Sequence, residues 1–296
     1  MNLLSEFNIF SFSKKIKRPL VLDGAMGSFL EKMGLTETDN AWSAKANIKY
    51  PDKVLKIHRS YIEAGADVIT TNTFRTNPYS LGQVGIKNFE RYVKKAISLA
   101  FEAKENLPVL IAGSNAPAED CYQVQRTITK KQLELNHRCH IDSLIDNGCH
   151  FILNETQGHF DEIKIISKHC EKYEIPFVMS LYFDENLCLL SGEKVSDVIN
   201  FLNDTNVLSL GFNCISDKIL IKLINQISMP ANWGFYLNCF STSEKQSKVC
   251  SISVAEYLAI VQEVIHFNPS FIGACCGSNP EFIKAIKGFL DGRIKH

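Results

Sequence analysis

The chain has 296 residues, of which 45% are hydrophobic, 22% charged and 10% aromatic, a composition that excludes disorder as its main state. Its 32 basic and 32 acidic residues cancel to a formal charge of zero, which argues against nucleic acid or an anionic membrane surface as a partner. No apolar run reaches the roughly 18 residues that a membrane-spanning helix needs. The basic cluster near the N-terminus follows the apolar part, unlike the order in a secretory signal, so we expect a cytoplasmic protein.

Eight short β-prone runs recur along the chain, each followed by a segment with helical periodicity. These runs are near-continuously apolar, which is typical of parallel strands covered on both faces. We predict strands at Pro19 to Asp23, Ala66 to Thr73, Val109 to Ser114, His150 to Glu155, Pro176 to Leu181, Val207 to Phe212, Asn232 to Leu237 and Phe271 to Gly273.

The segments between the runs place apolar residues at helical spacing, which predicts helices with one buried face. Three stripes are clear: Met26, Phe29, Leu30 and Met33; Val54, Leu55, His58, Tyr61 and Ile62; and Ile219, Leu220, Leu223, Ile224 and Ile227. The last helix has a recognisable start, with Asn279 as N-cap, Pro280 at the first position and Glu281 beside the positive end of the helix dipole.

Eight strand-then-helix units in one chain predict an α/β fold of the (β/α)8 TIM-barrel type. A doubly wound open sheet is the alternative, but the turn after the first strand reads DGAMG and lacks the GxGxxG spacing of a dinucleotide loop. No linker rich in Gly, Pro or Ser interrupts the alternation. We therefore expect an N-terminal extension over residues 1–18 and a single barrel domain over residues 19–296.

Polar residues collect where the predicted strands end, which is the edge at which a barrel builds its active site. In chain order these residues are Asp23; Thr71, Asn72 and Thr73; Ser114 and Asn115; Asn154 and Glu155; Ser180 and Tyr182; Asn213 and Cys214; Asn238 and Cys239; and Cys275 and Cys276.

The ten cysteines are expected to be reduced, because the chain lacks an export signal and is too long to need disulfides. Most should be buried hydrophobes, but Cys214, Cys275 and Cys276 lie at the ends of the sixth and eighth strands, which only one strand separates. Three thiolates there would suit zinc, with a fourth position open to substrate. The alternative interpretation of the adjacent pair is a redox-sensing dithiol, and Cys239 is an alternative ligand.

Two carboxylates, Asp23 and Glu155, are the other candidates for the site. A charged group at the barrel mouth can bind an ammonium group or act as an acid or base, although Asp23 could also cap the helix that follows it. His58 and His137 lie in helical stripes, where we expect them to be packed rather than to bind a metal.

The motifs resemble those of the homocysteine S-methyltransferases, which are zinc-dependent (β/α)8 barrels. The resemblance covers about residues 20–290 and rests on LDGAMGSFLE, WSAK, AGADVITTNTF, AGSNAP, NET, GFNC and GACCG in that order. It implies that Cys214, Cys275 and Cys276 are the zinc ligands. Ala274 replaces the second glycine of the frequent GGCCG form.

The same resemblance implies the roles of six further residues. Asp23 and Glu155 would hold the amino group of homocysteine, and the backbone N–H groups of Gly24, Ala25 and Met26 would bind its carboxylate. Asn213 would brace the metal loop.

The implied reaction is methyl transfer to the thiol of homocysteine, giving methionine. Because three thiolates and the substrate sulfur would leave zinc with a net negative charge, we expect a cationic sulfonium donor, S-methylmethionine or S-adenosylmethionine. The alternatives are a betaine- or corrinoid/methylfolate-dependent component and a non-catalytic thiol sensor. The expected partners are homocysteine and a small methyl donor.

Overall fold

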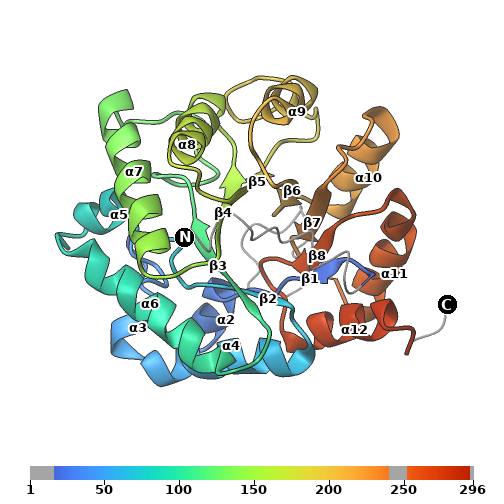
Figure 1. Cartoon of the computed structure of the whole chain (residues 1–296), viewed down its shortest axis with the longest axis horizontal. Helices are drawn as coiled ribbons and strands as arrows, with labels where there is room; N and C mark the ends of the chain where they lie inside the picture. Colours follow the sequence, from blue (N-terminus) through green and yellow to red (C-terminus); the bar gives the residue numbers. More distant parts are fainter. Residues whose placement is uncertain (1–16, 240–251, 294–296) are drawn as a thin grey trace.

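The computed structural model describes residues 17–239 and 252–293, and these residues form a ring of eight parallel strands surrounded by helices (Figure 1). The strands are β1 (Leu20–Val21), β2 (Val68–Thr70), β3 (Leu110–Asn115), β4 (Phe151–Gln157), β5 (Phe177–Leu181), β6 (Ser209–Asn213), β7 (Trp233–Leu237) and β8 (Phe271–Ala274). The helices are α2 (Gly27–Lys32), α3 (Ala46–Lys49), α4 (Pro51–Ala64), α5 (Pro78–Gln83), α6 (Phe89–Lys104), α7 (Lys130–Asp146), α8 (Phe160–Lys172), α9 (Val195–Asn203), α10 (Asp217–Gln226), α11 (Val254–Val264), the 3-10 turn η1 (Ile265–Phe267) and α12 (Pro280–Leu290).

The sheet closes on itself. Its strand order is β1-β8-β7-β6-β5-β4-β3-β2, and every pair is parallel. Between β1 and β2 the closure is a parallel bridge of Leu22 with Val68, flanked by the hydrogen bond from Asp67 N to Val21 O, 2.8 Å. The prediction of a (β/α)8 barrel is confirmed, and the open sheet is wrong.

Each strand is buried on both faces, which explains why the strand runs are almost entirely apolar. In β8, Phe271 points into the barrel while its neighbour Ile272 packs under the helices. The interior of the barrel is filled by Leu20, Leu22, Val68, Leu110, Ala112, Phe151, Leu153, Val178, Tyr236 and Phe271. A packed interior of this kind leaves the open space to the loops at the strand ends.

The contact between β7 and β8 is close enough to require a glycine. A Cβ on Gly234 would overlap the backbone oxygen and the ring of Phe271. We expect Gly234→Ala to lower the free energy of unfolding by about 1–3 kcal/mol, measured by urea denaturation. Gly82→Ala is the control, because a Cβ there meets nothing within 4 Å. Equal stability of the two variants would contradict this close packing.

The expected helix signals are largely confirmed. The Asn279 side chain accepts a hydrogen bond from Glu281 N, 2.8 Å, and caps α12 as expected. Met33 is an exception: it lies just beyond the end of α2 and its residue surface is 44% exposed, so the buried stripe is one residue shorter than predicted.

Residues 1–16 of the expected N-terminal extension lie outside the described residues. At its boundary, the Arg18 guanidinium bonds to the Asp67 carboxylate at 2.6 Å and lies 3.2 Å from that of Asp291. These contacts tie the start of the described chain to the end opposite the strand C-termini.

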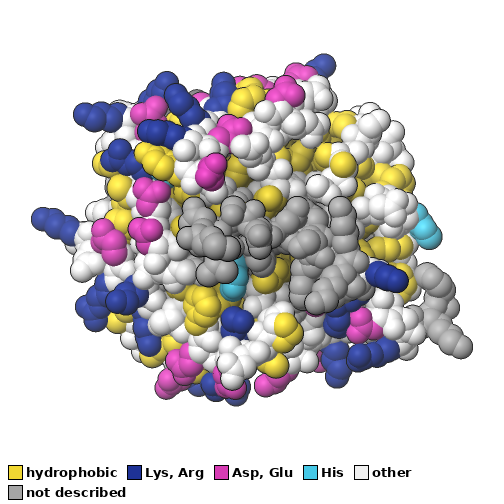
Figure 2. All heavy atoms as spheres, viewed as in Figure 1, with side chains coloured by type: hydrophobic (Ala, Val, Ile, Leu, Met, Phe, Trp, Pro, Cys, Tyr) yellow, Lys and Arg dark blue, Asp and Glu magenta, His cyan; other side chains and the backbone are white. Residues whose placement is uncertain are grey.

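On the face of the molecule shown in Figure 2, basic and acidic side chains are intermixed around the rim. Within residues 17–239 and 252–293, none of the helices has the length and apolar character needed to cross a membrane.

Candidate active site

A cleft of about 730 Å³ opens at the C-terminal ends of the strands, over the barrel interior. Eight of the nine site residues expected from the sequence line it: Asp23, Gly24, Ala25, Met26, Glu155, Cys214, Cys275 and Cys276. The ninth, Asn213, is fully buried behind the cleft wall. The loops after strands distant in sequence therefore form one continuous cavity.

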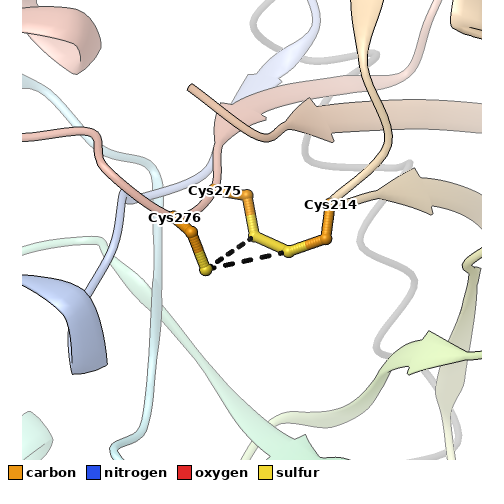
Figure 3. Close-up of side chains that lie close together, drawn as sticks. All are labelled: Cys214, Cys275 and Cys276. Atoms are coloured by element: carbon orange, nitrogen blue, oxygen red, sulfur yellow. Dashed lines mark hydrogen bonds between the residues drawn. A yellow bond between two sulfur atoms is a disulfide. The ribbon is translucent and has the colours of Figure 1, made fainter. Parts of the chain in front are cut away.

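The three expected cysteine sulfurs lie together (Figure 3). The Sγ atom of Cys276 is 3.9 Å from that of Cys214 and 4.0 Å from that of Cys275. Cys214 and Cys275 are themselves joined by a disulfide, with their Cα atoms 5.8 Å apart. The expectation that all ten cysteines are reduced is therefore wrong for this pair, because the fold brings the two strand ends within disulfide distance.

The chemistry and spacing of these sulfurs fit zinc once the Cys214–Cys275 pair is reduced. Tetrahedral zinc has Zn–S bonds of about 2.3 Å, which places ligand sulfurs about 3.8 Å apart. The Cys276 sulfur already lies at nearly that distance from both of the others. Three protein thiolates would leave the fourth position open, as in catalytic rather than structural zinc sites.

The backbone brings the adjacent pair to one point by turning sharply after β8. Gly277 has φ +86°, in the left-handed region, and its N–H donates to Ser28 Oγ at 3.0 Å. Cys214, directly after β6, is also left-handed with φ +54°. These turns allow side chains that would alternate on an extended strand to face the same position.

This geometry bears on the two alternatives for the cysteines, namely Cys239 as a metal ligand and the adjacent pair Cys275 and Cys276 as a redox sensor. Cys239 is fully buried in the hydrophobic core, and its backbone N–H donates to Cys276 O at 3.0 Å. Among the described residues, the thiols close enough to share a metal are Cys214, Cys275 and Cys276. The disulfide joins Cys214 to Cys275, not the adjacent pair proposed as a redox sensor.

Asp23 is a buried carboxylate held by the neighbouring strand. It accepts hydrogen bonds from Thr70 N at 2.8 Å and Thr70 Oγ1 at 2.9 Å. Burial, together with the nearby charge of Glu155, raises the pKa of Asp23 to about 8. The N-cap of α2 is Met26, with no capping side chain, so the alternative role of Asp23 as a helix cap is wrong.

Glu155 lies deep in the molecule but is open to the cleft. Its carboxylate accepts a hydrogen bond from Ser114 Oγ, and burial raises its pKa to about 7. Asp23 and Glu155 thus form a pair of acidic groups with no basic partner among the described residues. Such a pair is a suitable receptor for a ligand ammonium group, which would stabilise both ionised forms.

These pKa values predict a pH dependence of stability. Ordinary pKa values are 3.8 for Asp and 4.5 for Glu, so between about pH 5 and 8 the folded state retains protons that the unfolded chain has released. Stability should therefore fall as the pH rises, by on the order of a few kcal/mol. The measurement is thermal unfolding of the substrate-free protein against the Asp23→Asn/Glu155→Gln double variant.

The comparison with the double variant removes the contributions of other groups, such as His58 and His140, whose pKa values burial lowers to about 4 and about 3. If the stability of the two proteins changes with pH in the same way, the pKa values of the two carboxyl groups are not raised. His58 and His137, the two histidines predicted to be packed, are both buried, and so is His140.

The turn after β1 presents backbone donors to the cleft. Ala25 N is already engaged, because it donates to Ser278 Oγ at 3.0 Å. In the described part of the chain, the N–H groups of Gly24 and Met26 have no hydrogen-bond acceptor. Those two donors are therefore the better candidates for binding a substrate carboxylate.

A reciprocal pair of hydrogen bonds links β4, which carries Glu155, to β6, which Cys214 follows. Asn213 Oδ1 accepts from Thr156 N, and Asn213 Nδ2 donates to Thr156 Oγ1, both at 2.8 Å. Thr156 directly follows Glu155 and has φ +60°, while Asn213 directly precedes Cys214. The link therefore fixes the direction of both functional side chains.

Sequence reasoning missed the residues that orient the site, namely Thr70, Thr156 and Ser278. Thr156 is the last residue of the NET motif, so a signal for it was present. Thr70 and Ser278 lie in segments whose pairing with Asp23 and Ala25 becomes visible only when the barrel has closed.

These features define a class of protein: a (β/α)8 barrel that brings three cysteines and two carboxylates together at its strand ends. The family model for homocysteine S-methyltransferase matches residues 20–290. The chain therefore belongs to the homocysteine S-methyltransferase family.

Similar proteins span nearly the same length. The homocysteine S-methyltransferase of Escherichia coli (strain K12) is 26% identical over 297 residues, covering 90% of this chain and 94% of the relative. The selenocysteine Se-methyltransferase of Brassica oleracea var. italica is 22% identical, covering 92% and 89%. The crystal structure of the Escherichia coli homocysteine methyltransferase MmuM in its metallated form matches with a TM-score of 0.77 and 26% identity, covering 92% of this chain and 96% of that chain.

Proposed function

We propose that this protein transfers a methyl group from a sulfonium donor, S-methylmethionine or S-adenosylmethionine, to homocysteine, giving methionine. The observation that carries the proposal is the convergence of three sulfurs and two carboxylates in one cleft. The cysteines provide a place for the reacting sulfur, and the carboxylates provide a place for the amino group of the same substrate.

Different residues bind the different groups of homocysteine. Asp23 and Glu155 receive its ammonium group, while the N–H groups of Gly24 and Met26 receive its carboxylate. Cys214, Cys275 and Cys276 would hold zinc, which when bound keeps the substrate sulfur as a thiolate and fixes its position. Asn213 and Thr156 hold the two halves of this arrangement in register.

In the reaction, the homocysteine sulfur forms a bond to the donor methyl carbon. The bond between that carbon and the sulfonium sulfur breaks, and its electron pair stays on the departing sulfur. The step needs no general base once the thiol is ionised, so orientation is the main contribution of the protein. Alignment of this kind can remove roughly 7–11 kcal/mol from the barrier.

The charge of the cleft supports a cationic donor. Six acidic residues and a single basic one, Arg75, belong to its described lining; the acidic ones are Asp23, Glu31, Glu37, Asp39, Asp120 and Glu155. Lysines outside the lining pair with two of them, Lys45 with Asp39 and Lys49 with Glu37. The raised pKa values of Asp23 and Glu155 mean that a bound cation would favour their ionised forms. The ring of Trp42, at 6.2 Å from that of Phe74, adds an aromatic wall. Carboxylates and aromatic faces both attract a sulfonium group.

The test is metal analysis combined with a substrate screen on the reduced protein. We expect about one zinc per chain and methionine formation from homocysteine with a sulfonium donor. Methionine formed only with betaine or a methyl-corrinoid would overturn the donor assignment. Absence of stoichiometric metal, with a reversible disulfide, would favour the sensor. Selenocysteine as a second acceptor would show how strictly the site selects sulfur.

The proposed compartment is the cytoplasm. Metal binding requires Cys214 and Cys275 as thiolates, and a reducing environment maintains that state.

A further inference from the structure

Arg75 is the one arginine, lysine or histidine among the described residues that line the cleft. It lies in the loop after β2, and its side chain is 12% exposed. The guanidinium carbon lies 5.2 Å from the centre of the Phe74 ring, so the cation rests against the aromatic wall. A basic group in an otherwise acidic cleft needs an explanation.

The contacts of Arg75 leave much of its binding capacity unused. Nη1 donates to Glu119 O at 2.7 Å, and Nη2 lies 3.8 Å from Asp120 Oδ2, beyond hydrogen-bond distance. A guanidinium has five N–H donors, and the described chain supplies no further acceptor for the others. The planar fork matches a carboxylate, which can accept two parallel hydrogen bonds.

Asp120 stands next to this fork on a different loop, the one between β3 and α7. Its side chain is 60% exposed, and its Oδ1 accepts a hydrogen bond from Tyr122 N at 2.8 Å. A guanidinium and a carboxylate side by side form the complement of an α-amino acid head, which carries one charge of each sign. Both groups line the same cleft.

The proposed reaction needs two such receptors, because homocysteine and an amino-acid sulfonium carry the same head group. Asp23, with 5% of its surface exposed, and Glu155 lie on the cleft floor at the strand ends. Arg75 and Asp120 lie on the loops above these strand ends. Two heads bound at different depths can direct both reactive sulfur atoms toward the cysteine cluster.

Resting on the proposed function, we propose that Arg75 and Asp120 bind the α-amino acid head of the methyl donor. Arg75 binds its carboxylate and Asp120 binds its ammonium group. The pair therefore selects an amino-acid sulfonium over betaine, whose quaternary nitrogen has no hydrogen to donate to Asp120.

The test compares S-methylmethionine with two analogues that each lack one charge of the head: 3-aminopropyl(dimethyl)sulfonium, without the carboxylate, and 4-(dimethylsulfonio)butanoate, without the amino group. In the zinc-loaded protein, Arg75→Gln should lower kcat/KM for S-methylmethionine by about 10- to 100-fold and for the carboxylate-free analogue by less than about twofold. Asp120→Asn should lower it about 3- to 10-fold for S-methylmethionine but not for the amino-free analogue.

Asp120→Asn retains the oxygen that accepts from Tyr122 N, and Arg75→Gln retains an N–H group that can donate to Glu119 O, so the loops can keep their conformation. Arg91→Gln, on the exposed surface of α6, is the matched control. Calorimetric titration with S-methylmethionine gives a readout that does not depend on turnover, and the KM for homocysteine should stay constant.

Two results would overturn the subsite while leaving the proposed function intact. One is an equal loss with all three sulfonium compounds in Arg75→Gln. The other is a rise in the KM for homocysteine with no change in the KM for the donor, which would place homocysteine at Arg75. A wild-type protein active only with betaine or a methyl-corrinoid would overturn both the subsite and the proposed donor.

Discussion

Replacing Cys276 by serine should remove both the metal and the activity. The serine hydroxyl is nearly the size of the thiol but is a poor ligand for zinc, so two cysteines would remain to hold the ion. Loss of a partner in the outer shell of a metal site costs about 10- to 100-fold, and loss of a ligand should cost at least about 100-fold in methionine formation. Metal content and activity are measured on the same preparation.

Cys188→Ser is the matched control, because Cys188 is partly exposed and lies outside the sulfur cluster. It should retain both properties. If Cys276→Ser keeps its zinc and its activity, the cluster is not the catalytic centre. If the wild-type protein binds no metal but forms its disulfide reversibly, the thiol sensor is the better interpretation.

Replacing Glu155 by glutamine should weaken homocysteine binding without releasing the metal. Glutamine keeps an oxygen that can accept from Ser114 Oγ, but it removes the negative charge that faces the ammonium group. Hydrogen bonds to charged groups contribute about 1.5–3 kcal/mol, so we expect the KM for homocysteine to rise about 10- to 100-fold. Steady-state kinetics at saturating donor measures this change.

Glu134→Gln, on the exposed face of α7, controls for the change in overall charge. Zinc content should be the same in the wild-type protein, Glu155→Gln and Glu134→Gln. An unchanged KM for homocysteine in Glu155→Gln, with a loss confined to kcat, would place Glu155 in the chemical step and not in substrate binding.

The barrel could be predicted from the sequence because each strand is buried on both faces and so forms an apolar run. All eight runs are strands, although most of their ends move, by up to three residues. For example, the first predicted strand, Pro19 to Asp23, is reduced to Leu20–Val21 because Leu22 forms only an isolated bridge with Val68. Hydrogen bonding to a neighbouring strand decides such ends, and one sequence does not specify it.

The sulfur cluster could be predicted for a related reason. Once eight units are assumed to close into a ring, the ends of the sixth and eighth strands must be near each other. The left-handed backbone at Thr156 and Cys214 could not be predicted, because neither is a glycine. The approach of Arg75 to Asp120 also required the structure, since it depends on two loops of different units.

The positions of the proposed metal ligands have a consequence for the dynamics of the molecule. Cys214 and Cys275 follow β6 and β8, and β7 lies between these strands with ladder bonds to both. An ion shared by these cysteines would restrain three consecutive strands of the ring and leave the other five to their own packing. Chelation should therefore accelerate amide hydrogen exchange first in residues 209–237 and 271–277, well before the remainder of the ring loses protection.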